Sequence, residues 1–147
     1  MKFFTSEWWE SGCADKGVIE RYREYYNSIA QKLPQKIPEF EADHTIHDSN
    51  VKRIGSNLVE NNVEISLLGW DYDFNNRILY DLRFSGVSSF LQLFPFENRF
   101  EIDLGDLGYW EYEIVKEGIE MRMLFVSRAE FKIVFKDFEF KCTSTSS

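Results

Sequence analysis

The chain has 147 residues, with 25 Asp and Glu against 17 Lys and Arg, which gives a formal net charge of −8. This charge argues against nucleic acid as a direct ligand, because phosphate binding needs clustered Lys and Arg. Aromatic residues make up 17% of the chain, which excludes a disordered acidic tail and supplies a core without a disulfide, metal or cofactor. We expect a single folded domain over residues 1–142 and a disordered tail over residues 143–147.

The cysteines and the apolar runs indicate the compartment. Cys13 and Cys142 lie near opposite ends of the chain and form no CxxC motif, as expected for reduced thiols in the cytoplasm. No apolar run approaches the roughly 18 residues that would span a membrane. We therefore expect a cytoplasmic protein that does not bind membranes.

The first forty residues predict helices. Apolar residues recur at steps of three and four between residues 15 and 33, as on the buried face of an amphipathic helix. A shorter helix is expected over residues 6–12, with Thr5 or Ser6 as its N-cap. Pro34 and Pro38 are expected to end the helical region and to begin an extended connection.

After about His47, apolar and polar residues alternate with the period of a β-strand, in runs at 63–67, 78–84, 110–114, 119–125 and 131–135. Phe138 and Phe140 then take the opposite parity to Phe135, which predicts a bulge near Asp137. Short turns between the runs favour antiparallel neighbours. The sequence thus predicts an α+β fold, with N-terminal helices packed on a meandering antiparallel β-sheet of six or seven strands.

One group of residues has the chemistry of a metal site. His44, His47 and Asp48 combine two imidazoles with a carboxylate, and such groups bind zinc. Their spacing is not the helical spacing of an HExxH site, so hydrogen bonds in a turn are the favoured role. A small metal-dependent hydrolase that uses these three residues is the alternative function.

Negative charge is concentrated in residues 97–120, which contain eight acidic and two basic residues. If the even-numbered residues of 110–114 face the core, strand alternation places Tyr109, Glu111 and Glu113 on the open face. Aromatic rings among carboxylates suit a basic protein partner, because the rings supply contact area while the charges steer encounter. A solubilising face, or self-association in a homo-oligomeric structural protein, is the alternative role. The predicted partner-binding residues are Trp70, Asp71, Tyr72, Asp73, Asp103, Asp106, Tyr109, Glu111 and Glu113.

Five segments carry a resemblance to known proteins: MKFFTSEWW at residues 1–9, IHDS at 46–49, LRFSGV at 82–87, LGDLGY at 104–109 and FKIVF at 131–135. Together they resemble an uncharacterised family of small bacterial proteins, of the sort found among immunity proteins of polymorphic and contact-dependent toxin systems. The resemblance implies a cytoplasmic, non-enzymatic protein that blocks a cognate toxin domain, often a nuclease or tRNase, by tight binding. Such toxins tend to be basic, which agrees with an acidic binding surface. The resemblance assigns no binding residue.

Overall fold

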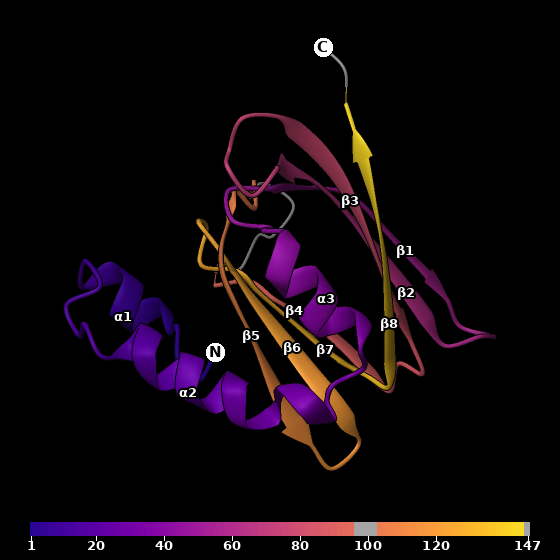
Figure 1. The fold of residues 1–147 in the computed structure, drawn as a ribbon, viewed down its shortest axis with the longest axis horizontal. Helices are drawn as coiled ribbons and strands as arrows, with labels where there is room; N and C mark the ends of the chain where they lie inside the picture. The colour runs from indigo at the N-terminus through magenta and orange to yellow at the C-terminus, as the bar shows by residue number, and fades with distance from the viewer. Residues whose placement is uncertain (96–102, 146–147) are drawn as a thin grey trace.

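The computed structural model describes residues 1–95 and 103–145, and these residues form an α+β fold with two four-stranded antiparallel sheets (Figure 1). The strand order is β1-β2-β3-β8 in one sheet and β4-β7-β6-β5 in the other. The helices are α1 (Ser6–Glu10), α2 (Val18–Ile29), the 3₁₀ helix η1 (Ala30–Lys32) and α3 (Lys36–Asp43). The strands are β1 (Asn50–Asn57), β2 (Asn62–Trp70), β3 (Arg77–Ser85), β4 (Ser89–Leu93), β5 (Leu107–Val115), β6 (Gly118–Phe125), β7 (Glu130–Phe135) and β8 (Asp137–Ser144).

The expected single sheet of six or seven strands is instead two sheets with eight strands in the described residues. The chain passes from one sheet to the other after β3, where Gly86 has a φ of 62°, and passes back at Lys136. The predicted bulge near Asp137 is therefore wrong. Phe135 ends a strand of one sheet, and Phe138 is the second residue of a strand of the other. The change of parity keeps both rings in the core, with centroids 6.5 Å apart.

Helices α1 and α2 form close to where the sequence predicts them, whereas α3 was not predicted. Thr5 caps α1, because its Oγ1 accepts a hydrogen bond from the Trp8 N–H at 3.1 Å. The helix expected over residues 15–33 is α2 followed by η1. Pro38 does not lie in an extended connection but in the first turn of α3. Proline is tolerated there because the first N–H groups of a helix have no partner within the helix.

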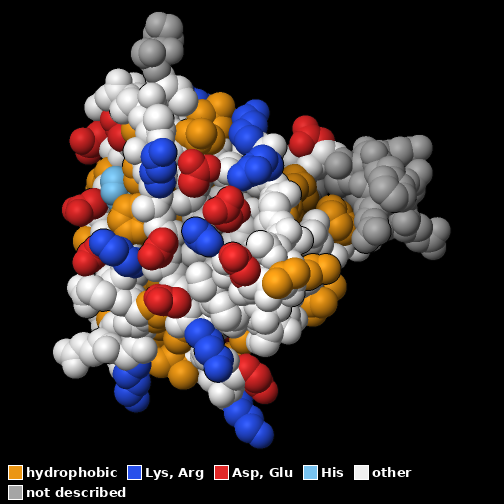
Figure 2. All heavy atoms as spheres, turned by 90° about the vertical axis from the view of Figure 1, so that its right-hand side faces the viewer, with side chains coloured by type: hydrophobic (Ala, Val, Ile, Leu, Met, Phe, Trp, Pro, Cys, Tyr) orange, Lys and Arg blue, Asp and Glu red, His pale blue; other side chains and the backbone are white. Residues whose placement is uncertain are grey.

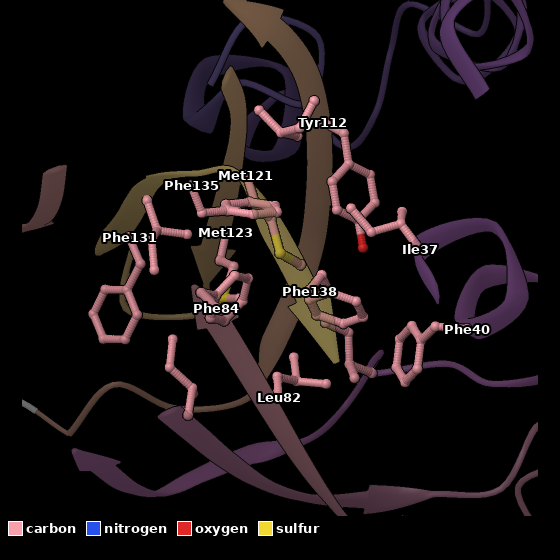
Figure 3. Packing of buried hydrophobic residues seen from close by; sticks show 14 of the residues in the cluster. Ile37, Phe40, Leu82, Phe84, Tyr112, Met121, Met123, Phe131, Phe135 and Phe138 are labelled. Carbon is pink, nitrogen blue, oxygen red and sulfur yellow. The ribbon is translucent and has the colours of Figure 1, made fainter. Parts of the chain in front are cut away.

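Helix α3 closes the core between the two sheets. It packs against β8, and its Ile37 and Phe40 side chains are fully buried. Figure 3 shows Phe40 beside Phe138 of β8 and Ile37 beside Tyr112 of β5. One hydrophobic cluster contains residues from both sheets, from α2 and from α3, so the sheets share their apolar interior.

Helix α2 packs beside β5, which is an edge strand of its sheet (Figure 1). The Tyr112 N–H donates to the Tyr22 hydroxyl at 2.9 Å, and the Ile114 N–H donates to the Tyr25 hydroxyl at 3.3 Å. These hydroxyls take the place of a further strand, so the helix satisfies backbone groups that an open edge would leave unpaired.

Two findings concern the limits of the chain. Strand β8 continues to Ser144, and Thr143 pairs with Leu79, so the disordered tail predicted from residue 143 is wrong at its first residues. Residues 146–147 of that tail lie outside the described residues. Among the described helices, none combines the length and apolar character needed to cross a membrane.

A substitution at Phe138 tests whether the chain, after it passes between the sheets at Lys136, places this ring in the shared core. Its ring is buried against the rings of Phe40, Phe84 and Phe135. Phe138→Ala is expected to lower the free energy of unfolding by about 3–5 kcal/mol, because it leaves a cavity in the shared core. Leu58→Ala, at an 87% exposed position, should change it by less than about 0.5 kcal/mol. Urea denaturation measures both, and equal small effects would place Phe138 outside the core.

Candidate functional site

Glu111 does not lie on an open face. Its side chain is fully buried, and its carboxylate accepts hydrogen bonds from the backbone N–H groups of Lys2, Phe3 and Phe4 at 2.5–3.1 Å. On its own sheet, the Arg122 Nε donates to it at 2.8 Å. The predicted role of Glu111 in partner binding is therefore wrong. The N-terminal segment, residues 2–4, covers the face of β5 that strand alternation left open.

Arg122 extends this contact into an ion-pair network. Its Nη1 donates to Glu113 at 2.7 Å and to Glu120 at 2.9 Å. Burial alone would lower the pKa of Arg122, but the carboxylates of Glu113, Glu111 and Glu120 raise it above its ordinary value. We call this set the Glu111 network; its members are Glu111, Glu113, Glu120, Arg122, Lys2 and Lys132.

The Glu111 network is balanced in formal charge, with three carboxylates and three cationic side chains. Glu113 keeps 21% of its side chain exposed and also pairs with Lys2 at 3.1 Å. Burial opposes its ionisation, but hydrogen bonds from Arg122 and Lys2 outweigh burial and lower its pKa. Glu113 thus forms ion pairs within the protein, and only the exposed part of its side chain is available to the predicted partner.

Fewer acidic residues of 97–120 are available on the described surface than the sequence suggested. Glu97 and Glu101 lie outside the described residues. Asp103 and Glu117 are exposed, and Asp106 is half-buried and accepts a hydrogen bond from the Asn50 amide. The start of β5 therefore keeps two of the predicted partner-binding carboxylates, Asp103 and Asp106.

The β2–β3 loop presents a second group of predicted residues. Asp71 accepts hydrogen bonds from the Asn75 N–H at 2.7 Å and the Asn76 amide at 2.8 Å. Hydrogen bonds from Asn76 and Asn75 lower the pKa of Asp71, which is ionised and holds the loop closed. Tyr72 and Phe74 are exposed by 60% and 45% of their surface. The loop thus displays two aromatic rings next to Asp73.

His47 joins this loop to the start of β5. Its ring lies 6.4 Å from the ring of Phe74, and its Nδ1 lies 2.7 Å from the carbonyl oxygen of Gly108. The next residue, Asp48, donates its backbone N–H to the Leu107 carbonyl at 2.8 Å. The structure therefore brings the two predicted groups to one end of the sheets (Figure 1). We call this surface the acidic end; it comprises Asp48, Asp71, Tyr72, Asp73, Phe74, Asp103 and Asp106.

Two predicted aromatic contacts are less available than expected. Tyr109 packs among Phe4, Trp8 and Trp9, with ring centroids 5.1–5.3 Å away, and burial raises its pKa to about 12. The adjacent Gly108 makes this packing possible, because a Cβ there would overlap the Trp9 ring. Trp70 is half-buried, and the guanidinium carbon of Arg77 lies 4.5 Å from its ring centroid.

The three residues of the predicted metal site have different surroundings. His44 contacts the rings of Phe40, Tyr80 and Phe140, and its Nε2 lies 3.7 Å from the Cys142 sulfur. His47 instead contacts Gly108 and Asp48. Within residues 1–95 and 103–145, no group of three or more His, Cys, Asp or Glu side chains is placed to hold a metal ion.

A pocket of about 430 Å³ opens between α2, α3 and β5. Glu41 of α3 lines it, and the Glu41 Oε1 accepts hydrogen bonds from Trp110 Nε1 at 2.8 Å and from the Tyr112 hydroxyl at 2.7 Å. Burial raises the pKa of Glu41, although these two hydrogen bonds oppose the shift. We call this the Glu41 pocket; its lining residues are Phe4, Ile19, Tyr22, Arg23, Tyr26, Glu41, His47, Gly108, Tyr109 and Trp110.

The outer face of the β1-β2-β3-β8 sheet has a different character. Figure 2 shows Lys and Arg interspersed with Asp and Glu on this side of the molecule. Glu64 of β2 lies 3.1 Å from Arg53 and 3.9 Å from Arg83 on the neighbouring strands. Cationic and acidic side chains alternate across the strands, so this face carries no field of one sign.

No protein-family model matches the chain, and no curated protein matches it either. The immunity family indicated by the sequence motifs therefore remains a prediction.

Sequence reasoning missed two residues of this region, Glu41 and Arg122. Arg122 lies in an otherwise apolar run, and the turn at Lys116 and Glu117 sets it directly opposite Glu111 in the β5–β6 hairpin. An isolated cation opposite an isolated carboxylate was the available signal for a buried pair. Glu41 had no such signal, because its partners on β5 are about 70 residues away.

Glu111→Ala tests the Glu111 network. It leaves a buried guanidinium without one partner and three backbone N–H groups without an acceptor, so the free energy of unfolding should fall by about 3–5 kcal/mol. Glu117→Ala, at an exposed position of the same hairpin, should change it by less than about 0.5 kcal/mol. Urea denaturation compares the two, and a loss below about 1 kcal/mol for Glu111→Ala would mean that the buried pair is not formed.

The raised pKa of Glu41 predicts a pH dependence of stability. The folded state holds the Glu41 proton more tightly than the unfolded state, so this contribution is complete below the unfolded pKa and is lost as pH rises through the folded value. The stability of the wild type relative to Glu41→Gln should therefore fall as pH rises above about 4.3. Tyr112, Tyr22 and Tyr26 face Glu41 with raised pKa values and remain neutral in this range.

Chemical denaturation from pH 4 to 9 measures this difference. Glu39→Gln is the matched control, since Glu39 is exposed on the same helix and pairs with Lys36 at 3.0 Å. A relative stability that increases with pH would show that the folded state favours ionised Glu41.

Proposed function

We propose that this protein is a non-enzymatic binding protein that neutralises a basic protein partner, in the manner of an immunity protein acting on its toxin in the cytoplasm. The observation that carries the proposal is the acidic end. There, exposed Tyr72 and Phe74 lie on a loop that carries Asp71 and Asp73, beside a second acidic segment at the start of β5.

The chemistry of the acidic end suits a cationic surface. Exposed aromatic side chains give desolvated contact area when they are covered, and Tyr in particular is common among residues that dominate binding energy. Carboxylates around them attract a basic partner over distance and raise the association rate. Because Asp71 fixes the loop through its hydrogen bonds, Tyr72 and Phe74 lose less conformational entropy on binding than residues of an unconstrained loop.

The acidic end differs in charge from two other parts of the described surface. On the outer face of the β1-β2-β3-β8 sheet, Glu64 lies between Arg53 and Arg83. In the Glu111 network the acidic residues are paired with Arg122, Lys2 and Lys132. At the acidic end, by contrast, no Lys or Arg among the described residues pairs with Asp71, Asp73 or Asp103, which favours it over these two parts as the contact region.

We expect a secreted protein to be encoded beside this chain, and the test uses the C-terminal domain of that protein. Complex formation and rescue of growth when both are expressed are expected. Asp73→Lys combined with Asp103→Lys should slow association about tenfold at low salt and less at high salt, because it removes electrostatic steering. Stopped-flow mixing at two salt concentrations measures the rates.

Glu60→Lys combined with Glu117→Lys is the matched control, because it changes the net charge by the same amount. Glu60 is exposed in the turn before β2, at the opposite end of that strand from Trp70, and Glu117 is exposed in the turn between β5 and β6. These two reversals should leave the association rate nearly unchanged. Equal slowing by both variants would assign the effect to net charge alone, and the absence of any complex with this domain would contradict the proposed function.

A further inference from the structure

The Glu41 pocket combines an apolar wall with one carboxylate. Aromatic rings of Tyr22, Tyr26 and Trp110 line it together with the aliphatic side chain of Ile19, which is 48% exposed. Its volume of about 430 Å³ is that of a site for a small ligand or a long side chain. A ligand in this pocket must therefore satisfy both an aromatic surface and an acidic group.

Glu41 retains the capacity to accept a further hydrogen bond. Its two hydrogen bonds from Trp110 and Tyr112 both end on Oε1. Among residues 1–95 and 103–145, no side chain or backbone group donates to its Oε2. The carboxylate is thus held in position by two donors while one oxygen remains for a ligand.

The other charged groups around the pocket have partners of their own. Arg23 lies 3.1 Å from Glu20. His47 has its Nδ1 beside the Gly108 carbonyl and its Nε2 3.5 Å from Asp48. Glu41 is therefore the lining carboxyl group that has no cationic partner in the described residues.

This arrangement favours a cation over neutral and anionic ligands. An ammonium or guanidinium group is attracted by aromatic faces, and a nearby cation stabilises the ionised form of a carboxyl group. An aliphatic stem on the cation would cover the apolar wall and remove its surface from water. A neutral ligand of the same shape could not form an ion pair with Glu41, and an anion would not stabilise its ionised form.

The position of the pocket indicates the source of the cation. His47 lines the pocket and also contacts Phe74 of the acidic end, so the two surfaces are continuous. We propose that the Glu41 pocket receives a lysine or arginine side chain of a bound polypeptide. This inference rests on the proposed function, because it assigns to the basic partner one side chain that inserts beside its main contact surface.

The experiment uses short peptides with the full chain and needs no partner. Acetyl-Gly-Lys-Gly-amide and acetyl-Gly-Arg-Gly-amide are titrated at pH 8, and acetyl-Gly-norleucine-Gly-amide supplies an uncharged aliphatic side chain. The Trp110 indole N–H resonance reports binding directly, because this group donates to Glu41. The charged peptides should shift it with a dissociation constant on the order of millimolar, and Glu41→Gln should weaken them about tenfold or more.

Glu39→Gln is the control and should leave the peptide affinities unchanged. Equal binding of the norleucine peptide, unchanged affinity in Glu41→Gln, or no shift with any peptide would overturn the inference. Pentylamine is titrated in parallel as a free amine. If it binds while neither charged peptide does, the inference is also overturned, in favour of a free amine as the ligand. Because the acidic-end variants leave Glu41 intact and the peptide titration contains no partner, failure of this inference is distinguishable from failure of the proposed function.

Discussion

The carboxylate of Glu111 joins the N-terminal segment to the β4-β7-β6-β5 sheet. It lies on the face of β5 that would otherwise be open, and it satisfies three consecutive backbone N–H groups of residues 2–4 as well as the Arg122 Nε. Ionised groups cost free energy when they leave water, and this cost is offset only when hydrogen bonds and opposite charges surround them. Glu111 has both, so the covering of this face by Phe4, Trp8 and Trp9 depends on it.

This contact also changes where negative charge is available. The acidic stretch of the sequence contributes three carboxylates to a balanced network with Arg122, Lys2 and Lys132. The surface left for the proposed basic partner is the acidic end, which is assembled from the β2–β3 loop, the segment before β1 and the start of β5. The Glu41 pocket lies next to it because the same strand, β5, borders both. Glu111 and Glu113 of β5 thus make ion pairs within the protein, whereas Asp103 and Asp106, just before this strand, belong to the acidic end.

Local patterns in the sequence predicted most elements of the fold. Alternation of period two located β2, β3, β5, β6 and β7, and the Thr5 cap located α1. The pattern missed β1 and β4, because β1 is largely polar and β4 has only five residues. The pattern also predicted a bulge where the chain passes between sheets at Lys136. At a bulge and at a passage between sheets alike, the apolar positions shift by one residue, so the sequence does not distinguish the two.

The candidate site was harder to predict, because burial depends on contacts between distant residues. Alternation placed Glu111 opposite the core correctly, but it gave no sign that a segment more than 100 residues earlier covers it. Tyr109 was misjudged for the same reason, because Phe4, Trp8 and Trp9 pack on it. Tyr72 and Asp73, predicted as partner-binding residues, are exposed, since a loop between two strands needs no distant partner to define its surface.

Amide hydrogen exchange at Phe3 and Phe4 tests most directly whether Glu111 holds the N-terminal segment on the sheet. Both N–H groups donate to a carboxylate that is shielded from water, so their exchange should be slowed by orders of magnitude relative to an unstructured peptide. The protection should disappear in Glu111→Ala, which removes the acceptor, at a pH where the rest of the sheet stays protected. Exchange of both amides at the rate of an unstructured peptide in the wild type would contradict the account.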